Sequence, residues 1–212
     1  MRKKVDLWID LRSPYSFLAK DPAYDLERDF EAELRLRPFA LDIAGAVNLG
    51  DPEAIARGMR KIKYFYQDAR RFANQRSITL LGPKKIFDQT LVHLAWLYAD
   101  KSGHGRSVID LAYPRFFKRE LDYEDRGAVM GLLTDAGVDT SGFDAFADGE
   151  GPAELKRHQQ EAEQCSRCRP SSLTASSSGV RTGSTSCARS SRPDQARWPS
   201  GSGGQPARSR RL

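Results

Sequence analysis

The fold of this chain is decided by residues 5–16, which read VDLWIDLRSPYS. Residues 5–10 form a short apolar run with β-branched and aromatic side chains, which is typical of a buried strand. The run leads directly into Ser13-Pro14, where the serine hydroxyl can cap a helix and the proline can occupy its first position. We therefore predict a strand, a tight turn and a helix that extends towards Phe30, with a kink or a restart at Pro22.

A second strand is indicated after this helix. Residues 33–39 alternate two leucines with two arginines, and this period of two is that of a strand. Because the connections are short, we expect a right-handed β-α-β unit with parallel strands. The first domain of the predicted organisation therefore spans residues 1–45.

The next hundred residues are predicted to be helical and form a second unit, residues 46–164. Asp51-Pro52 repeats the pattern of a capping residue followed by a proline. Gly82-Pro83 breaks the chain, and the apolar spacing after it predicts a helix over residues 84–100. Further helices are indicated near residues 108–117, 129–133 and 151–164. Two strands alone make a marginal sheet, so the missing strands should follow residue 164.

The composition changes after Gln164, where we place a third segment, residues 165–212. Serine, arginine, glycine and proline dominate it without a helical or strand period, so we expect disorder. It carries nine arginines and one acid, Asp194, and therefore holds more than the whole formal net charge of +6. Residues 1–164 are mildly acidic. A basic tail could bind nucleic acid through phosphates, but Trp198 is its only aromatic residue, so we expect no nucleic-acid partner.

All three cysteines, Cys165, Cys168 and Cys187, lie in this last segment. The first two have the spacing of a redox pair or of half a zinc site, but the other ligands and the preceding strand that such sites need are missing. We expect no metal site. The absence of a disulfide framework fits a reducing compartment, and no signal peptide or long apolar run is visible, so we expect a cytoplasmic protein without a membrane partner.

Residues 10–19, DLRSPYSFLA, resemble the start of the 2-hydroxychromene-2-carboxylate isomerases, close relatives of the kappa-class glutathione transferases in the DsbA-like branch of the thioredoxin fold. Arg37-Pro38 matches the end of that family's second strand. Lys61, Tyr64 and Asp68 match a K-x-x-Y-x-x-x-D pattern in its helical insertion. The resemblance covers residues 5–164. It implies an α/β, thioredoxin-like fold with a large all-helical insertion, in which the C-terminal strands of the thioredoxin domain are missing here.

The resemblance also implies a reaction. Ser13 and Ser16 stand where redox relatives carry cysteines, so this turn forms no disulfide. Ser13 would instead donate a hydrogen bond to the thiolate of glutathione and would be the catalytic residue. The thiolate would add reversibly to a conjugated double bond of an aromatic or conjugated carboxylate, which gives an isomerase. A glutathione transferase or a binding module without redox activity is the alternative. On the residues alone, without the resemblance, Ser13 is interpreted as a helix cap only.

Three further residues would bind glutathione or substrate in this interpretation. Lys61 would pair with a carboxylate, Asn48 would hold the ligand, and Arg12 would add positive charge beside Ser13. Each has an ordinary alternative, namely a solvated helix lysine, a turn residue and a side chain that faces water. Tyr64 and Asp68 could orient the lysine or be plain helix surface. His93, in an apolar helix, is interpreted as a satisfied interior or interface histidine, and His104 as part of a loop.

The family's closing strands can be recovered by back-translation. One permitted set of codons for residues 168–184, read one base earlier, encodes VPSFVVDGELFWGPDRL, which contains two alternating strands around an Asp-Gly turn. We therefore interpret the last segment as the product of a frameshift near Gln164, which the coding DNA would test. We expect the chain as it stands to bind glutathione weakly or not at all and to be a poor or inactive enzyme. Kappa-class relatives are dimers, so the resemblance admits a homodimer.

Overall fold

A computed structural model describes residues 2–42 and 51–167 of the chain. It begins with strand β1 (Lys3–Ile9), helix α1 (Pro14–Asp29) and strand β2 (Ala32–Pro38). The two strands are parallel, with Lys3 opposite Ala32 and Ile9 opposite Pro38, so the predicted β-α-β unit is confirmed. Its strands begin one or two residues earlier than the sequence indicated. Helix α1 includes Pro22 and does not restart there.

The two strands divide their side chains between an apolar face and a charged face. Val5, Leu7 and Ile9 of β1 are almost completely buried. On the opposite face, Asp6 accepts hydrogen bonds from Arg35 at 2.8 Å and Arg37 at 3.1 Å across the pair. The predicted alternation of leucine and arginine in β2 therefore serves both packing and pairing between the strands.

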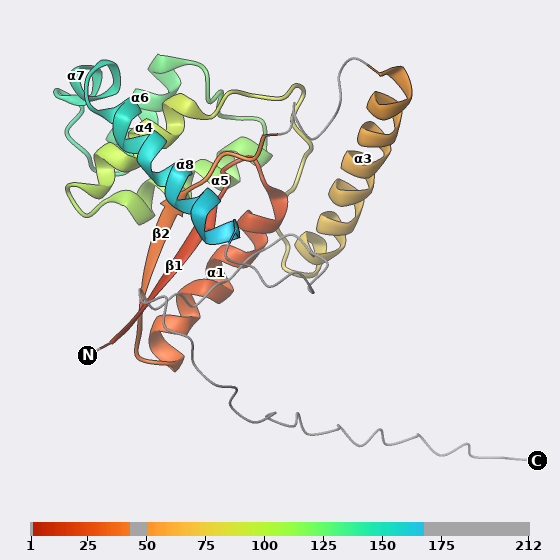
Figure 1. The fold of residues 1–212 in the computed structure, drawn as a ribbon, viewed down its shortest axis with the longest axis horizontal. Helices are drawn as coiled ribbons and strands as arrows, with labels where there is room; N and C mark the ends of the chain where they lie inside the picture. Colours follow the sequence, from red (N-terminus) through yellow and green to blue (C-terminus); the bar gives the residue numbers. More distant parts are fainter. Residues whose placement is uncertain (1, 43–50, 168–212) are drawn as a thin grey trace, which may run out of the picture.

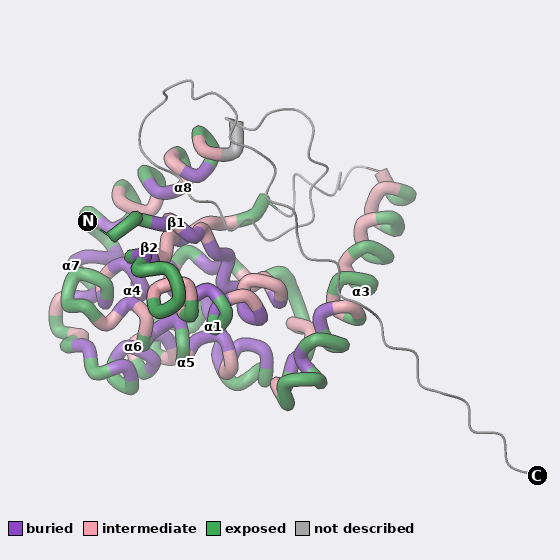
Figure 2. Tube along the Cα trace, turned by 90° about the horizontal axis from the view of Figure 1, so that it is seen from below, coloured by how far each residue is buried: buried purple, intermediate pink, exposed green. Residues whose placement is uncertain are grey.

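Six helices follow in the described residues: α3 (Pro52–Gln75), α4 (Thr90–Asp100), α5 (Gly105–Phe117), α6 (Arg126–Asp135), α7 (Phe143–Asp148) and α8 (Gly151–Arg167). Helix α4 lies at the centre of this group, since it contacts α5, α6, α7 and α8. Every residue from Val92 to Leu97 is buried in it. Figure 2 shows this concentration of buried residues in α4 and its neighbours, together with the two strands.

Helix α4 is shorter than predicted. The sequence indicated a helix over residues 84–100, but the helix begins only at Thr90. Asp88 explains the late start, because its carboxylate accepts hydrogen bonds from the backbone N–H of Thr90 at 2.8 Å and from its hydroxyl at 2.7 Å. A local turn of this kind competes with helical hydrogen bonding.

Helix α3 stands away from the rest of the molecule (Figure 1). Only Ala69 and Ala73 are buried in it, near its C-terminal end, where it contacts α1. Its N-terminus is capped by Asp51, whose carboxylate accepts a hydrogen bond from the N–H of Glu53 at 2.9 Å, as the Asp51-Pro52 pattern predicts.

The described part of the chain contains a two-stranded sheet and no further strand, in agreement with the expectation that the C-terminal strands of the fold are missing before residue 165. Helix α8 continues to Arg167, three residues beyond the predicted end of the globular part, so Cys165 lies in a helix. Asn48, Cys168, Cys187 and the rest of the last segment lie outside the described residues. None of the helices in residues 2–42 and 51–167 combines the length and apolarity needed to cross a bilayer.

Candidate functional site

Ser13 caps the first helix, as its sequence predicts. It precedes α1 with extended backbone angles, and its Oγ accepts a hydrogen bond from the N–H of Ser16 at 3.3 Å. Pro14 occupies the first helical position and has no N–H to leave unpaired. The N–H groups and the positive end of the helix dipole at this turn can stabilise a negative charge placed nearby.

The carboxylate of Asp10 holds this turn in shape. Its Oδ1 accepts hydrogen bonds from the N–H of Arg12 at 2.7 Å and from the Arg12 Nε at 3.3 Å. Its Oδ2 accepts from Arg12 Nη2 at 3.1 Å and from the N–H of Leu41 at 2.8 Å. The backbone carbonyl of Asp10 accepts from the N–H of Ser13 at 3.0 Å. One buried side chain therefore joins the end of β1, the start of α1 and the segment after β2.

Arg12 is part of the same anchor and does not face water, because its side chain is only 13% exposed. Besides Asp10, its guanidinium donates hydrogen bonds to the carbonyl oxygens of Phe87 at 3.0 Å and Leu41 at 2.8 Å. These contacts use all but one of the N–H groups of a guanidinium. Asp10 balances the charge of Arg12. This predicted ligand-binding residue therefore has a structural role, which is to connect the turn with Phe87 and Leu41.

Two buried tyrosines donate hydrogen bonds to backbone carbonyls of the turn. The Tyr113 hydroxyl donates a hydrogen bond to the carbonyl oxygen of Asp10 at 3.1 Å, and the Tyr123 hydroxyl donates to that of Leu11 at 3.2 Å. Burial is the main cause that raises the pKa of both hydroxyls well above the usual value of tyrosine. Both hydroxyls therefore remain protonated and continue to donate.

Helix α3 is connected to the turn by Tyr15. Its hydroxyl donates a hydrogen bond to Asp68 Oδ2 at 2.9 Å, and its ring lies edge-on to Phe65 with 6.2 Å between centroids. Burial and this hydrogen bond raise the pKa of Tyr15 to about 12. Asp68 therefore contacts the turn instead of orienting Lys61.

Lys61 lies seven residues before Asp68 in α3 and is exposed. Seven residues separate it from Asp68, so it shares the same helix face but is displaced by about 10 Å along the axis. Tyr64 is also exposed, at 57%. Lys61 thus shares a helix face with Asp68 but lies in the N-terminal half of α3, while Asn48 lies outside the described residues.

We expect Tyr15→Phe to lower the free energy of unfolding by about 1 kcal/mol, because it removes one hydrogen bond to a carboxylate. Backbone amides in the C-terminal half of α3 should also exchange faster with solvent, since that half depends on contacts with α1. Urea unfolding and hydrogen exchange measure the two effects. Tyr64→Phe is the matched control and should leave both unchanged; an equal loss in both variants would show that the Tyr15–Asp68 contact contributes nothing.

His93 is an interior residue, as predicted, but the expected hydrogen-bond partners of its ring are not found among the described residues. It is completely buried, and neither ring nitrogen has a hydrogen-bond partner in the part of the chain that the structure describes. The side chain of Gln89, one helical turn earlier, is also buried without a described partner. Burial lowers the pKa of His93 to about 4, so the ring is neutral near pH 7. His104 precedes α5 and belongs to a loop, as predicted.

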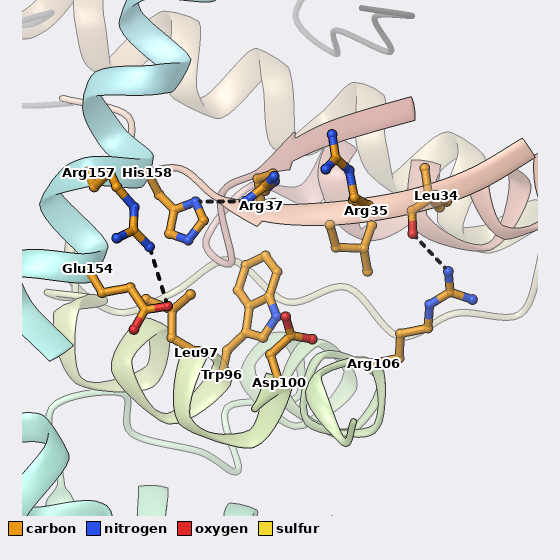
Figure 3. A pocket seen from close by; sticks show the side chains of 11 residues that line it. Leu34, Arg35, Arg37, Trp96, Leu97, Asp100, Arg106, Glu154, Arg157 and His158 are labelled. Atoms are coloured by element: carbon orange, nitrogen blue, oxygen red, sulfur yellow. Dashed lines mark hydrogen bonds and ion pairs between the residues drawn. The ribbon is translucent and has the colours of Figure 1, made fainter. Parts of the chain in front are cut away.

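A cavity of about 320 Å³ lies elsewhere, between β2, α4, α5 and α8. Its cationic side chains are already paired (Figure 3): Arg37 contacts Asp6 and His158, Arg106 contacts Glu27 and the Leu34 carbonyl, and Arg157 contacts Glu154. Neither this cavity nor a second one of about 280 Å³ is lined by Ser13. Within the described residues, no group of His, Cys, Asp and Glu side chains is arranged to hold a metal ion.

Residues 4–167 match the family model of the DSBA-like thioredoxin domain. The chain belongs to this family. Among its relatives, a 2-hydroxychromene-2-carboxylate isomerase of Sphingobium xenophagum is 27% identical over 167 residues, which cover 77% of this chain and 84% of the relative. The candidate site of this DsbA-like protein is the turn between β1 and α1, where Ser13 caps the helix.

Two solved structures confirm the fold. A 2-hydroxychromene-2-carboxylate isomerase matches with a TM-score of 0.60 and 19% identity, over 76% of this chain and 79% of its own. The cytosolic disulfide reductase DsbM of Pseudomonas aeruginosa matches with a TM-score of 0.55 and 16% identity, over 77% and 78%. The names of these two proteins give different activities on one fold, so the fold alone does not decide the activity.

Sequence reasoning missed three features of this DsbA-like protein. It did not assign a role to Asp10, it did not connect Tyr15 with Asp68, and it did not recognise the tyrosine hydroxyls under the turn. An acid directly after a strand and before a capped helix is a local signal that could have indicated the first. The other two join segments more than 50 residues apart in sequence and leave no local signal.

Proposed function

We propose that this chain is built as a glutathione-dependent isomerase that acts on an aromatic or conjugated carboxylate. The name of the Sphingobium relative supports the reaction. The residues of the turn support the use of a thiol from solution, because Ser13 and Ser16 occupy the start of α1 and no cysteine precedes Cys165. A helix start without a cysteine keeps the electrostatic environment that stabilises a thiolate but lacks a thiol of its own.

One observation carries this proposal. The Oγ of Ser13 already accepts a hydrogen bond from the N–H of Ser16, and a hydroxyl has a single hydrogen to donate. Its own hydrogen therefore remains available for an external acceptor. The residues present thus fit a sulfur anion at this turn, held by the Ser13 hydroxyl and the positive end of α1.

Bound glutathione would supply a thiolate nucleophile that adds reversibly to the substrate's double bond and so allows rotation about it. The chain's part is to hold that anion and to keep the turn rigid. Asp10 and Arg12 perform the second task through the contacts described above. Lys61, on the same face of α3 as Asp68, is our candidate for a substrate or glutathione carboxylate, and Asn48 remains a candidate outside the described residues.

The experiment compares Ser13→Ala, Ser13→Asp and Ser13→Thr in a frame-restored protein, with 2-hydroxychromene-2-carboxylate and glutathione as reactants. Aspartate keeps the helix cap but has no hydrogen to donate near pH 7, so it separates capping from catalysis. We expect Ser13→Asp and Ser13→Ala to lose about 100-fold or more in kcat, as when one donor to a reacting anion is removed. Ser13→Thr should retain most of the activity.

Full activity of Ser13→Asp would show that Ser13 is a cap only. The 212-residue chain needs a separate measurement, because we expect it to bind glutathione weakly. Calorimetric titration of the full chain that gives a micromolar Kd would contradict this expectation. No detectable binding would confirm it without affecting the result for the restored protein.

A further inference from the structure

The cavity between β2, α4, α5 and α8 contains polar groups that the described part of the chain leaves without a partner. Trp96 of α4 is only 1% exposed, and its indole nitrogen lies at the cavity beside the carboxylate of Asp100 (Figure 3). An indole N–H can only donate a hydrogen bond, and none is found for Trp96 among the described residues. Because a buried donor without a partner costs free energy, this N–H favours an acceptor inside the cavity.

His158 of α8 supplies a second donor. Its side chain is 7% exposed, and its Nδ1 lies 3.4 Å from Nη1 of Arg37. A guanidinium only donates, so Nδ1 is the acceptor in this contact. Burial and the charge of Arg37 lower the pKa of His158, so the ring is neutral near pH 7 and carries its hydrogen on Nε2. Figure 3 shows Nε2 turned away from Arg37 and towards α4, where it has no described hydrogen-bond partner.

The charges of the cavity are separated. Asp100, the last residue of α4, has no described hydrogen bond or ion pair on its side chain, and desolvation raises the pKa of its carboxyl group. Near His158, the carboxylate of Asp6 is shared by Arg35 and Arg37, so one positive charge is in excess there. The cavity therefore has a positive end at Arg37 and His158 and a negative group at Asp100.

Apolar side chains complete the lining. Leu34 and Leu97 are buried, and Leu36 of β2 also borders the cavity. A volume of about 320 Å³ is at the lower end of the range found for small-molecule sites. The cavity therefore suits a small ligand with both charges and a short aliphatic group.

We propose that this cavity binds a free α-amino acid with an aliphatic side chain. The ligand's carboxylate accepts hydrogen bonds from the Trp96 N–H and from Nε2 of His158, and its ammonium group pairs with Asp100. The Trp96 N–H lies beside the Asp100 carboxylate (Figure 3), which matches a carboxylate and an ammonium group on one carbon atom. An anion alone would leave Asp100 unpaired, and an amine alone would leave the two N–H groups without an acceptor. Ser13 does not line this cavity, so the site is separate from the turn.

The test titrates the full 212-residue chain with L-leucine by calorimetry. The comparison ligands are 4-methylpentanoate, which lacks the amino group, and 3-methylbutylamine, which lacks the carboxylate. We expect a Kd below about 1 mM for L-leucine and at least tenfold weaker binding of each comparison ligand. Equal affinity for the three ligands, or no binding of L-leucine at millimolar concentration, would overturn the proposal.

The indole N–H signals in a nitrogen-15 NMR spectrum locate the bound ligand. The chain has three tryptophans, Trp8, Trp96 and Trp198, and the signal that disappears in Trp96→Phe identifies Trp96. L-leucine should shift this signal and leave the other two in place. Binding that leaves the Trp96 signal unchanged would show that the ligand lies outside the cavity, which contradicts the proposal.

A pair of charge variants tests the ammonium contact. Asp100→Asn should weaken the binding of L-leucine at least tenfold, because it removes the partner of the ammonium group. Asp135→Asn is the matched control, since Asp135 ends α6 as Asp100 ends α4 and does not line the cavity. Equal affinities of the two variants would refute the contact. If Asp100→Asn does not fold, the comparison of the three ligands on the wild type still decides, and none of these results depends on isomerase activity.

Discussion

Replacing Asp10 by alanine is expected to lower the free energy of unfolding by about 3–5 kcal/mol, enough to unfold much of the chain. The variant would leave the guanidinium of Arg12 buried without its counterion, with a side chain only 13% exposed. It would also remove the acceptor for the N–H of Leu41. Urea unfolding followed by circular dichroism measures this loss.

The paired controls identify the cause. Asp10→Ala with Arg12→Leu removes both charges, so it should be more stable than Asp10→Ala alone. Asp6→Ala, which removes a more exposed carboxylate that also pairs with arginines, should cost about 1 kcal/mol. If Asp10→Ala and Asp6→Ala cost the same, the buried pair is not the anchor of the turn.

The second large effect is an acid-dependent loss of stability that arises from His93. Its pKa is about 4 in the folded protein, against about 6.5 in an unfolded chain. Below pH 6.5 the unfolded state therefore binds a proton that the folded state does not bind. Stability falls as the pH decreases from about 6.5 to about 4, by about 3 kcal/mol in total, and this contribution is constant below the folded pKa.

The measurement compares the unfolding free energy of the wild type and of His93→Gln at pH 7 and pH 4. The charges of Asp10, Arg12 and Asp88 also act on the ring. Their effects are common to both proteins, so the difference between the two proteins isolates His93. His158→Gln is the control, because burial also lowers the pKa of this ring; its effect should have the same sign and be smaller. An identical pH profile for wild type and His93→Gln would refute the prediction.

The local parts of the fold were predicted correctly. Ser13-Pro14 and Asp51-Pro52 start helices in the structure because a cap and a first-turn proline act within three residues. The two strands are parallel because a short helical connection permits little else. The predicted start of α4 was wrong, since the hydrogen bonds of Asp88 compete with helix formation in a way that apolar spacing does not reveal.

The candidate site was predicted less completely than the fold. The sequence correctly placed Ser13 at the helix start, and it correctly placed His93 in the interior. It did not show that Arg12 points into the protein, because the groups that hold it come from Leu41 and Phe87. It also did not show that His93 lacks described partners, because that depends on which side chains surround α4.

By itself, then, the sequence determined the β-α-β start, the cap at Ser13 and the lack of a cysteine at the turn. Each of these depends on residues that are neighbours along the chain, so short-range chemistry is sufficient. Only the tertiary structure decided that Asp10 neutralises Arg12 and that Tyr15 holds α3. These features depend on packing between distant segments, where burial determines which polar groups find a partner.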